Sequence, residues 1–340
     1  MKNIQKVSLK IHSLATDYVK PKLRQRFLDG IKGLGLSEFH SINGNGRMLT
    51  SRPKAGEQRL YRTSHDMRFV DIIQRLIIER FLPKSGLLHL SLDHSQFDRF
   101  YIAVLALSVG RGRSLPIWCQ VGFRDRELMR PLIRALTLLF QVLGEDSKRI
   151  LLTMDRWYAS PKLLPFLSSY DVRFICRIKA NLPVMVPWDP YHTMLAGEIS
   201  HEELMVEYAG QGLRFVQSDY HEGMKQKEPW FLLTNVPAQE LSRQQVIHYY
   251  AKRFEIEEFF KDIKWIQRYE WQKIMRPEVI TVVLHFAFLG WWLLYSCMQP
   301  EVRLSRSRHI HPKQRLSWFR VCWEALQREI HQEAYAILSG

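Results

Sequence analysis

The chain has 340 residues, of which 46% are hydrophobic and 24% are charged, and this balance excludes a disordered or fibrous protein. Its 49 lysines and arginines outnumber its 34 aspartates and glutamates, which gives a net charge of +15. Such an excess favours a polyanionic partner, because lysine and arginine neutralise phosphates when proteins bind nucleic acid. The length allows one large domain or two medium ones.

The cysteines indicate a reducing compartment. They lie far apart, with neither a C-x2-C pair nor the histidine spacing of a zinc site, at Cys119, Cys176, Cys297 and Cys322. The first residues also lack the sustained apolar core and the small-residue cleavage site of a signal peptide. We therefore expect a cytoplasmic protein without a disulfide framework.

One segment is nearly apolar and long enough to span a bilayer. Val279–Cys297 reads VITVVLHFAFLGWWLLYSC. It contains His285, it is the only such segment in the sequence, and a helix buried on all sides has the same composition. We expect a core helix and no membrane partner.

Residues 1–85 are expected to be helical and basic. Ser41–Gln58 contains a cluster of Gly, Asn, Ser and Pro residues, which predicts an irregular loop. In Phe69–Leu82, apolar residues recur at helical spacing and predict a helix that packs on the following elements.

An alternating pattern begins at Leu87, where LLHLSLDHS predicts a strand with one buried face. Further strands are expected at Arg99–Val109, Leu115–Phe123, Lys148–Asp155, Val172–Ala180 and Trp230–Val236. A helix is expected over Arg126–Gly144, with Pro131 in its first turns. The chain beyond Arg276 is expected to be helical. No GxGxxG or GxxxxGK[ST] motif is present, so nothing supports a nucleotide cofactor.

The segment HYYAKRFEIEEFFKDIKW, His248–Trp265, predicts one helix with two different faces. At about 100° per residue, a stripe about 60° wide holds the polar residues Tyr250, Arg253, Glu257 and Lys264. A separate arc, roughly 80° to 180° away, holds the apolar residues Ile256, Phe259, Phe260 and Ile263. Taken alone, the stripe also fits a solvated helix with an Arg253–Glu257 pair.

Two aspartates at predicted strand positions add two carboxylates to the one in the polar stripe. Asp93 lies in the first predicted strand, Asp155 ends the fourth, and Glu257 is the carboxylate of the stripe. Three carboxylates from separate elements suit two Mg²⁺ or Mn²⁺ ions, which prefer oxygen ligands. Two such ions about 4 Å apart can activate a water or a 3′-hydroxyl and stabilise the leaving oxygen of a phosphodiester.

The signature Y-x2-R-x3-E-x6-K, which here runs from Tyr250 to Lys264, resembles that of DDE transposases of the insertion-sequence-four family. LSLDHS around Asp93 resembles the segment with that family's first aspartate, and TMDRWYAS around Asp155 resembles the second. The resemblance covers roughly Leu87–Lys273.

The resemblance implies an α/β fold of the RNase H-like type, a mixed sheet flanked by helices with a β-rich insertion before the catalytic helix. It divides the chain into a basic helical region at 1–85 that binds DNA ends, a catalytic domain at 86–273, and a helical C-terminal region at 274–340. The insertion is expected at about 181–228.

The resemblance also implies the roles of single residues. The catalytic triad, which would bind two Mg²⁺ or Mn²⁺ ions, is Asp93, Asp155 and Glu257. The residues that would contact DNA phosphates are Tyr250, Arg253 and Lys264. Arg156 would either contact a phosphate or pair with Asp155. Asp98 could compete with Asp93 as the first ligand, although it is predicted to lie in a turn.

The implied activity is cut-and-paste transposition, in which a nick at the element end is followed by strand transfer from the 3′-hydroxyl. The implied partner is double-stranded DNA, both the terminal inverted repeats and the target, held by a homodimer at the nucleoid of a prokaryotic cell. Some relatives form a hairpin and hold a flipped base on tryptophan. Candidates here, each of which could instead be a core residue, are Trp157, Trp188, Trp230, Trp265 and Trp271.

The remaining acids are expected to be solvated: Asp125, Glu127, Glu255, Glu258 and Asp262. His94 is expected to be a surface or hydrogen-bonded histidine that can touch the site. Two other functions on the same fold stay open, an inactive or regulatory DNA-binding protein and a non-transposing nuclease. The intact triad argues against decay, because clustered carboxylates repel one another.

Overall fold

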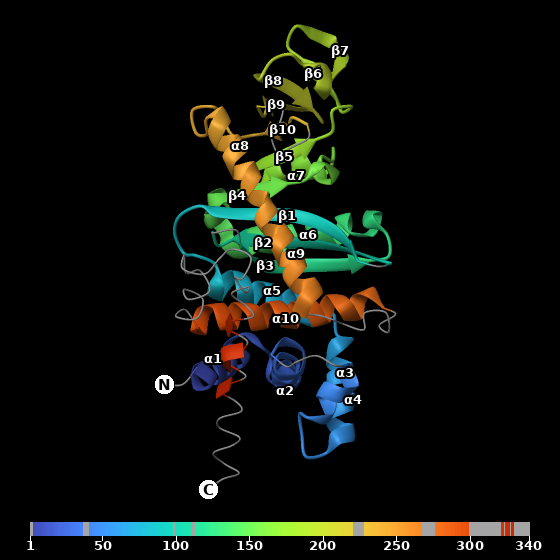
Figure 1. Ribbon diagram of the computed structural model, residues 1–340, viewed down its shortest axis with the longest axis vertical. Helices are drawn as coiled ribbons and strands as arrows, with labels where there is room; N and C mark the ends of the chain where they lie inside the picture. The colour runs from blue at the N-terminus through green and yellow to red at the C-terminus, as the bar shows by residue number, and fades with distance from the viewer. Residues whose placement is uncertain are drawn as a thin grey trace.

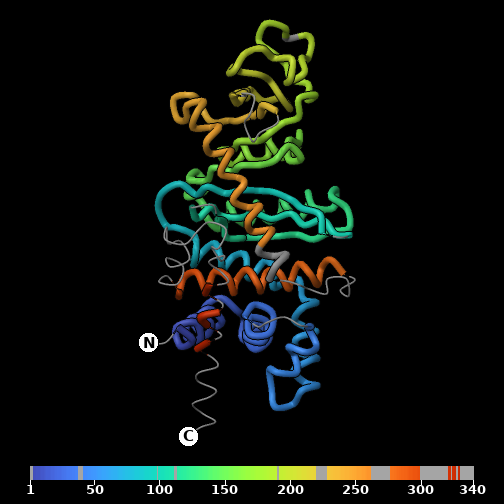
Figure 2. The backbone as a smooth tube through the Cα atoms, viewed as in Figure 1, coloured from blue at the N-terminus to red at the C-terminus, as the bar shows by residue number. Residues whose placement is uncertain are grey.

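The computed structural model describes residues 3–36, 41–97, 99–110, 113–219, 228–266, 276–298, 321–322, 324–326 and 328–329. Its centre is one ten-stranded mixed sheet, and helices pack around it (Figure 1). The trace in Figure 2 shows the N-terminal helices at one end of the molecule and the last hairpins of the sheet at the other. The expected mixed α/β architecture is confirmed.

The described residues before the sheet form α1 (Asn3–Tyr18), α2 (Pro21–Gly30), the π-helical turn η1 (Ile31–Gly35), α3 (Ile42–Arg47), α4 (Pro53–Ser64) and α5 (Arg68–Phe81). The prediction of an irregular loop at Ser41–Gln58 is wrong, because α3 and the first half of α4 lie there. Ser41 caps α3 by accepting a hydrogen bond from the Gly44 N–H at 2.8 Å. Pro53 occupies the first position of α4, where a missing N–H costs nothing.

The central strands lie close to their predicted bounds. They are β1 (Leu88–Phe97), β2 (Phe100–Ser108), β3 (Ser114–Gly122), β4 (Ile150–Met154), β5 (Arg173–Ile178) and β10 (Phe231–Thr234). β1, β2 and β3 form an antiparallel meander, whereas β4 pairs in parallel with both β1 and β5. The order of the whole sheet is β3-β2-β1-β4-β5-β10-β9-β8-β6-β7.

The expected β-rich insertion is present between β5 and β10. It consists of β6 (Pro183–Val186), β7 (Asp189–Leu195), β8 (Glu203–Tyr208) and β9 (Gln211–Gln217). β9 pairs with β10, so the insertion prolongs the central sheet and does not form a separate one. In Figure 1 it occupies the top of the molecule.

The helices after β3 are α6 (Met129–Leu143), α7 (Leu163–Ser169), α8 (Arg243–Ala251), α9 (Glu255–Ile266) and α10 (Pro277–Cys297). Short 3₁₀ turns are η2 (Asp125–Glu127), η3 (Gly144–Arg149), η4 (Arg156–Tyr158), η5 (Ala196–Glu198) and η6 (Lys252–Phe254). The prediction of one continuous helix over His248–Trp265 is wrong, because η6 separates α8 from α9. α9 crosses the front of β1, β2 and β3, and α6 lies behind them (Figure 1).

α10 closes the open edge of the sheet at β3. The Thr281 hydroxyl accepts a hydrogen bond from the Val121 N–H at 3.1 Å, and the Trp292 indole N–H donates to the Pro116 carbonyl at 2.6 Å. These bonds satisfy backbone groups that an edge strand would otherwise expose. In the described part of the chain, α10 alone is long and apolar enough to cross a membrane, but 89% of its most apolar window is buried inside the protein. The expectation of a core helix is confirmed.

The N-terminal helices share one hydrophobic core with α10 and the sheet. This core runs from Val7 in α1, through the sheet, to Leu326. Backbones meet closely where η1 crosses α10, because a Cβ on Gly290 would lie 2.2 Å from the Gly35 carbonyl oxygen. Only glycine fits that crossing. The proposed division of the chain at residues 85 and 273 stays a prediction.

Candidate active site

The parallel pairing of β1 with β4 brings two aspartates side by side. In this pairing Leu92 stands opposite Met154. Asp93 follows Leu92 within β1, and Asp155 follows the last residue of β4. Because neighbouring strands of a sheet are about 4.8 Å apart, the register sets the two carboxylates next to each other on one face.

Asp93 is a buried carboxylate surrounded by charges of both signs. Its Oδ2 accepts a hydrogen bond from Arg253 Nη1 at 2.5 Å, and its Oδ1 accepts one from the His94 N–H at 2.8 Å. Burial raises the pKa of Asp93 to about 6, Arg253 opposes this shift, and repulsion from Asp155 and Glu257 adds to it. The charges of both other proposed metal ligands, Asp155 and Glu257, therefore influence the pKa of Asp93.

Arg253 in η6 is the cation among these acids. It is 4% exposed, and its Nη2 lies 3.8 Å from Glu257 Oε1. Burial acts against its charge, but Asp93, Tyr250 and Asp155 together outweigh burial and the pKa of Arg253 is raised. The guanidinium also lies 4.7 Å from the ring centroid of Phe254. Its Nε is buried and has no hydrogen-bond partner among the residues that the structure describes.

Tyr250 connects the end of α8 to the second aspartate. Its hydroxyl lies 3.5 Å from Asp155 Oδ1, and the whole side chain is buried. Burial raises the pKa of Tyr250, and Arg253 acts in the opposite direction. Trp230 packs edge-on against the Tyr250 ring at 5.0 Å between centroids. Tyr250 therefore stays a neutral hydrogen-bond donor at neutral pH.

Glu257 is held toward the site by the packing of α9. Ile256, Phe259 and Phe260 are buried beneath the helix, as the predicted apolar arc requires. The Glu257 side chain keeps 48% of its surface exposed. The side chain of Lys264, in the polar stripe, lies outside the described part of the structure. The side chain of Ile263, in the apolar arc, also lies outside it.

Three neighbouring acids that were predicted to be solvated each have a partner. Glu255 and Asp125 are half-buried, whereas the Glu258 side chain stays 40% exposed. Glu255 accepts a hydrogen bond from the Ser108 hydroxyl at the end of β2, and Glu258 pairs with Arg113 at 3.6 Å. Asp125 accepts hydrogen bonds from the Trp157 indole N–H at 3.3 Å and from a backbone N–H. The helical pattern alone does not reveal these partners, because they come from distant strands and turns.

The donor set suits hard divalent cations. In the described residues, no three His, Cys, Asp or Glu side chains lie close enough to enclose an ion, and Arg253 lies among the three acids. The acids nevertheless supply only carboxylate oxygens, which Mg²⁺ and Mn²⁺ prefer. Burial is the main cause of the raised pKa of Asp93, repulsion from Asp155 and Glu257 adds to it, and a nearby cation would favour the charged carboxylate. Because all their ligand atoms are carboxylate oxygens, Asp93, Asp155 and Glu257 fit the metal ions that the family resemblance implies.

Arg156 lies beside the acids but does not pair with them. It follows Asp155 in η4, is exposed, and forms no ion pair with Asp155 among the residues described. With Arg177 and Lys179 it lines a hollow of about 230 Å³. Of its two predicted roles, a partner for Asp155 is therefore not realised. Asp98 lies outside the described residues.

The candidate tryptophans lie in different settings. Trp157 is half-buried against His94, at 4.9 Å between ring centroids, whereas Trp188 is 52% exposed and stacks on His201. Trp230 packs on Tyr250. Trp271 lies outside the described residues, as does the side chain of Trp265. Trp157 follows Asp155 by two residues in η4, whereas Trp230 is linked to Asp155 through Tyr250.

One polar group near the acids, the Tyr158 hydroxyl, escaped the sequence patterns. It is buried without a hydrogen-bond partner among the described residues, and burial, followed by the charge of Asp93, raises its pKa well above the usual value. His94, which was expected to touch the site, has a buried Nδ1 that also finds no partner in the described part of the chain. TMDRWYAS drew attention to the aromatic residues after Asp155, but their burial depends on the tertiary fold.

A comparison with known protein families identifies one match. The family model described as "Transposase DDE domain" matches residues 111–293. This range contains Asp155 and Glu257, whereas Asp93 precedes it and is brought to them by the pairing of β1 with β4. No curated protein matches the chain. Because the match covers more than half of the sequence, the chain belongs to the transposase DDE domain family.

Proposed function

We propose that this transposase cuts and joins DNA at the ends of an insertion sequence of the insertion-sequence-four type. Family membership gives transposase activity with DNA as the partner. The single observation that carries the finer proposal is the placement of Asp93 beside Asp155, with Arg253 reaching from Asp93 to Glu257. The Y-x2-R-x3-E-x6-K spacing supports the same assignment.

In the proposed mechanism, Asp93, Asp155 and Glu257 would hold two Mg²⁺ or Mn²⁺ ions. When bound, such ions would activate the attacking oxygen and stabilise the leaving oxygen of the phosphodiester. Water attacks the phosphodiester at the element end and its P–O3′ bond breaks, which leaves a 3′-hydroxyl on the element and a 5′-phosphate on the flanking DNA. The 3′-hydroxyl then loses its proton and attacks a phosphodiester of the target DNA, and the target 3′-oxygen leaves and takes up a proton. The carboxylates orient the reacting groups, and the chain forms no covalent bond to DNA.

The proposed phosphate contacts come from Tyr250, Arg253, Lys264 and Arg156. Exposed Arg156 can reach a phosphate directly, as the basic lining of its hollow favours. Arg253 is buried on Asp93, so a phosphate contact requires its guanidinium to exchange a carboxylate for the DNA. Buried Tyr250 would then act by orienting Asp155 and Arg253.

The proposal extends to the assembly and its setting. A pair of element ends has to be held together before strand transfer, for which a homodimer is the smallest symmetric solution. The substrate comprises terminal inverted repeats and target DNA, and the setting is the cytoplasm of a prokaryotic cell, at the nucleoid. The four cysteines, all free thiols in the structure, are compatible with a reducing compartment.

The test compares Glu257→Gln with Glu258→Gln. The substrate is a linear duplex that carries one end of the DNA element encoding the chain, incubated with Mg²⁺ and then with target DNA. We expect Glu257→Gln to lose at least about 100-fold in cleavage, because a neutral amide is a poor ligand for a hard cation. Glu258→Gln should cleave normally, since Glu258 pairs on the surface with Lys261 and Arg113.

The outcomes separate the rival functions. Full cleavage by a folded Glu257→Gln protein would sink the assignment of the triad. Cleavage without terminal-repeat preference or strand transfer would identify a non-transposing nuclease. Binding without any metal-dependent cleavage by the wild-type chain would identify an inactive or regulatory DNA-binding protein.

A further inference from the structure

Helices α3 and α4 form a compact pair beyond α10, at the end of the molecule away from the insertion (Figure 1). A Cβ on Gly56 would lie 2.2 Å from the Gly46 carbonyl oxygen, so the two helices cross in direct backbone contact. The Asn45 side chain ties α3 to η1 by donating to the Gly33 carbonyl at 2.9 Å. Buried Leu60 fixes the inner side of α4. The outward face of α4 is therefore presented by a rigid base.

That outward face carries polar side chains at helical spacing. We define the α4 face as the exposed residues Lys54, Gln58, Tyr61 and Arg62. They follow one another at i, i+4, i+7 and i+8, which places them on one side of the helix. Tyr61 is 52% exposed and its ring lies 4.1 Å from that of His65. An exposed tyrosine beside two cations and an amide is a surface suited to a polar ligand, not to a protein core.

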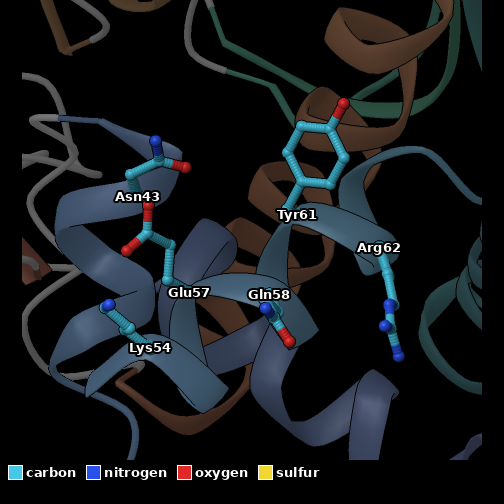
Figure 3. A pocket seen from close by; sticks show the side chains of 6 residues that line it. All are labelled: Asn43, Lys54, Glu57, Gln58, Tyr61 and Arg62. Carbon is cyan, nitrogen blue, oxygen red and sulfur yellow. The ribbon is translucent and has the colours of Figure 1, made fainter.

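The α4 face lines a hollow of about 480 Å³, shown in Figure 3. Its lining residues are Asn43, Lys54, Glu57, Gln58, Tyr61 and Arg62. Glu57 is the only acid among them, and Arg47 neutralises it at 3.2 Å. In the described residues neither Lys54 nor Arg62 forms an ion pair, so both cations are available to an external anion.

The surrounding sequence has a strong excess of positive charge. Between residues 41 and 65 the basic residues are Arg47, Arg52, Lys54, Arg59 and Arg62, whereas Glu57 is the sole acid. An anionic partner with regularly spaced charges would complement this segment. A single phosphate would engage only part of it, whereas a duplex offers phosphates on both sides of a groove.

We propose that the α4 face enters the major groove of duplex DNA and reads the ends of the element. The major groove is about 12 Å wide and admits an α-helix. Lys54 and Arg62 would bind phosphates or guanine, Gln58 can pair with adenine through two hydrogen bonds, and Tyr61 can contact a phosphate. This inference rests on the proposed function, because a transposase has to distinguish its own ends from other DNA.

The test uses the full-length chain without divalent cations, so that cleavage does not interfere. A pool of random 25-base-pair duplexes is selected for binding, and fluorescence anisotropy then measures affinity for the enriched duplex and for a scrambled one. The double variant Lys54→Ala/Arg62→Ala is compared with Lys84→Ala/Arg130→Ala. The second pair removes the same charge from exposed residues outside the α4 face.

We expect Lys54→Ala/Arg62→Ala to bind the enriched duplex at least about 10-fold more weakly, while the control pair binds as the wild type does. The slope of log affinity against log salt should fall by about two, since about one unit is lost for each phosphate contact. Gln58→Ala should change the enriched sequence at one position by about 10-fold in preference while leaving affinity for scrambled DNA unchanged.

The inference is overturned if the wild-type chain enriches no sequence, or if the double variant keeps the affinity and the salt slope. Circular dichroism on heating checks folding, and the single Gln58→Ala change serves if the double variant unfolds. Failure of the proposed catalytic site is distinguishable, because it appears as cleavage by Glu257→Gln while the α4 variants still lose binding.

Discussion

Arg253 makes three neighbouring carboxylates compatible with a folded chain. It is buried, it donates to Asp93 at 2.5 Å, and it lies 3.8 Å from Glu257. A buried charge without a partner is strongly destabilising, so the arginine and the acids depend on each other. At the scale of single residues, the described part of the site is a cluster of three acids with one buried arginine, and the proposed metal ions would supply the further positive charge.

The raised pKa of Asp93 predicts an unusual dependence of stability on pH. Its folded-state pKa is about 6 against an ordinary value of 3.8, so the folded chain binds this proton more tightly than the unfolded chain does. The stabilising contribution is fully present below pH 3.8 and is lost as the pH rises through 6. Without divalent cations, we expect Asp93 to lower the free energy of unfolding by about 1–2 kcal/mol between pH 5 and pH 7.5.

Urea denaturation of the wild type and Asp93→Asn at several pH values in EDTA measures this contribution as the difference between the two curves. Parallel curves from pH 5 to pH 7.5 would contradict it. Adding Mg²⁺ to the wild type should remove most of the loss at pH 7.5, since a bound cation favours the charged carboxylate.

At the scale of elements, the segment that carries the proposed catalytic Glu257 consists of two helices joined by a 3₁₀ turn, and α10 packs against the second helix. The 3₁₀ turn η6 separates α8, which carries Tyr250, from α9, which carries Glu257. Phe259 of α9 packs on Phe288 and Trp291 of α10. α10 in turn seals β3 through Thr281. The position of Glu257 therefore depends on a helix that bears none of the proposed catalytic residues.

Gly290→Ala tests the close crossing of α10 and η1. The new methyl group would lie 2.2 Å from the Gly35 carbonyl oxygen, which is backbone and cannot move aside alone. We expect a loss of about 2–4 kcal/mol in the free energy of unfolding. Thermal unfolding followed by circular dichroism provides the measurement.

Gly212→Ala is the matched control, because a Cβ at that position would meet nothing within 4 Å. A Gly290→Ala protein that melts at the same temperature as Gly212→Ala and the wild type would show that the crossing is not tight.

At the scale of the whole molecule, one hydrophobic core joins the three regions that the family resemblance led us to expect, residues 1–85, 86–273 and 274–340. Phe27 of α2 contacts Phe69 of α5 and Phe286 of α10, at 6.4 Å and 6.1 Å between ring centroids. The Arg26 guanidinium also lies over the Phe69 ring at 5.6 Å. The helices of residues 1–85 thus pack on α10 and present the α4 face at the same time, so the proposed DNA recognition and the stability of the core depend on the same helices.

Removal of residues 1–66 should therefore not release a folded catalytic domain. Truncation uncovers apolar side chains of α10 that now pack on Phe27 and its neighbours. We expect residues 67–340 to aggregate or to bind a hydrophobic dye without cooperative unfolding. A soluble fragment that unfolds cooperatively would instead show that residues 67–340 fold without residues 1–66.

Much of the fold follows from local patterns in the sequence. The alternating leucines before Asp93, the apolar run before Asp155 and the periodic apolar residues of α5 each depend on which side of one element is buried. The apolar arc of α9 is predictable for the same reason. The proposed ligands Asp93, Asp155 and Glu257 could likewise be selected from their residue types and their positions on these elements.

Other features depend on contacts between distant parts of the chain. The glycines and prolines near residue 50 suggested a loop, but Gly46 and Gly56 serve a tight crossing of two helices. The helical wheel places Glu257 on the polar stripe and Glu255 away from it, but the partner of Glu255, Ser108 at the end of β2, is known only from the tertiary structure.

The sequence by itself determined the class of fold and the basic character that favours a polyanionic partner, and it selected the three acids that we propose as metal ligands. It could do so because composition and periodicity are local properties. The tertiary structure decided that Arg253 is held on Asp93, which lies 160 residues away in sequence, and that α4 presents a polar face to solvent. Both features depend on the folded chain. A charge acts over a few ångströms of space, and the distance between two residues in space cannot be read from their separation in the sequence.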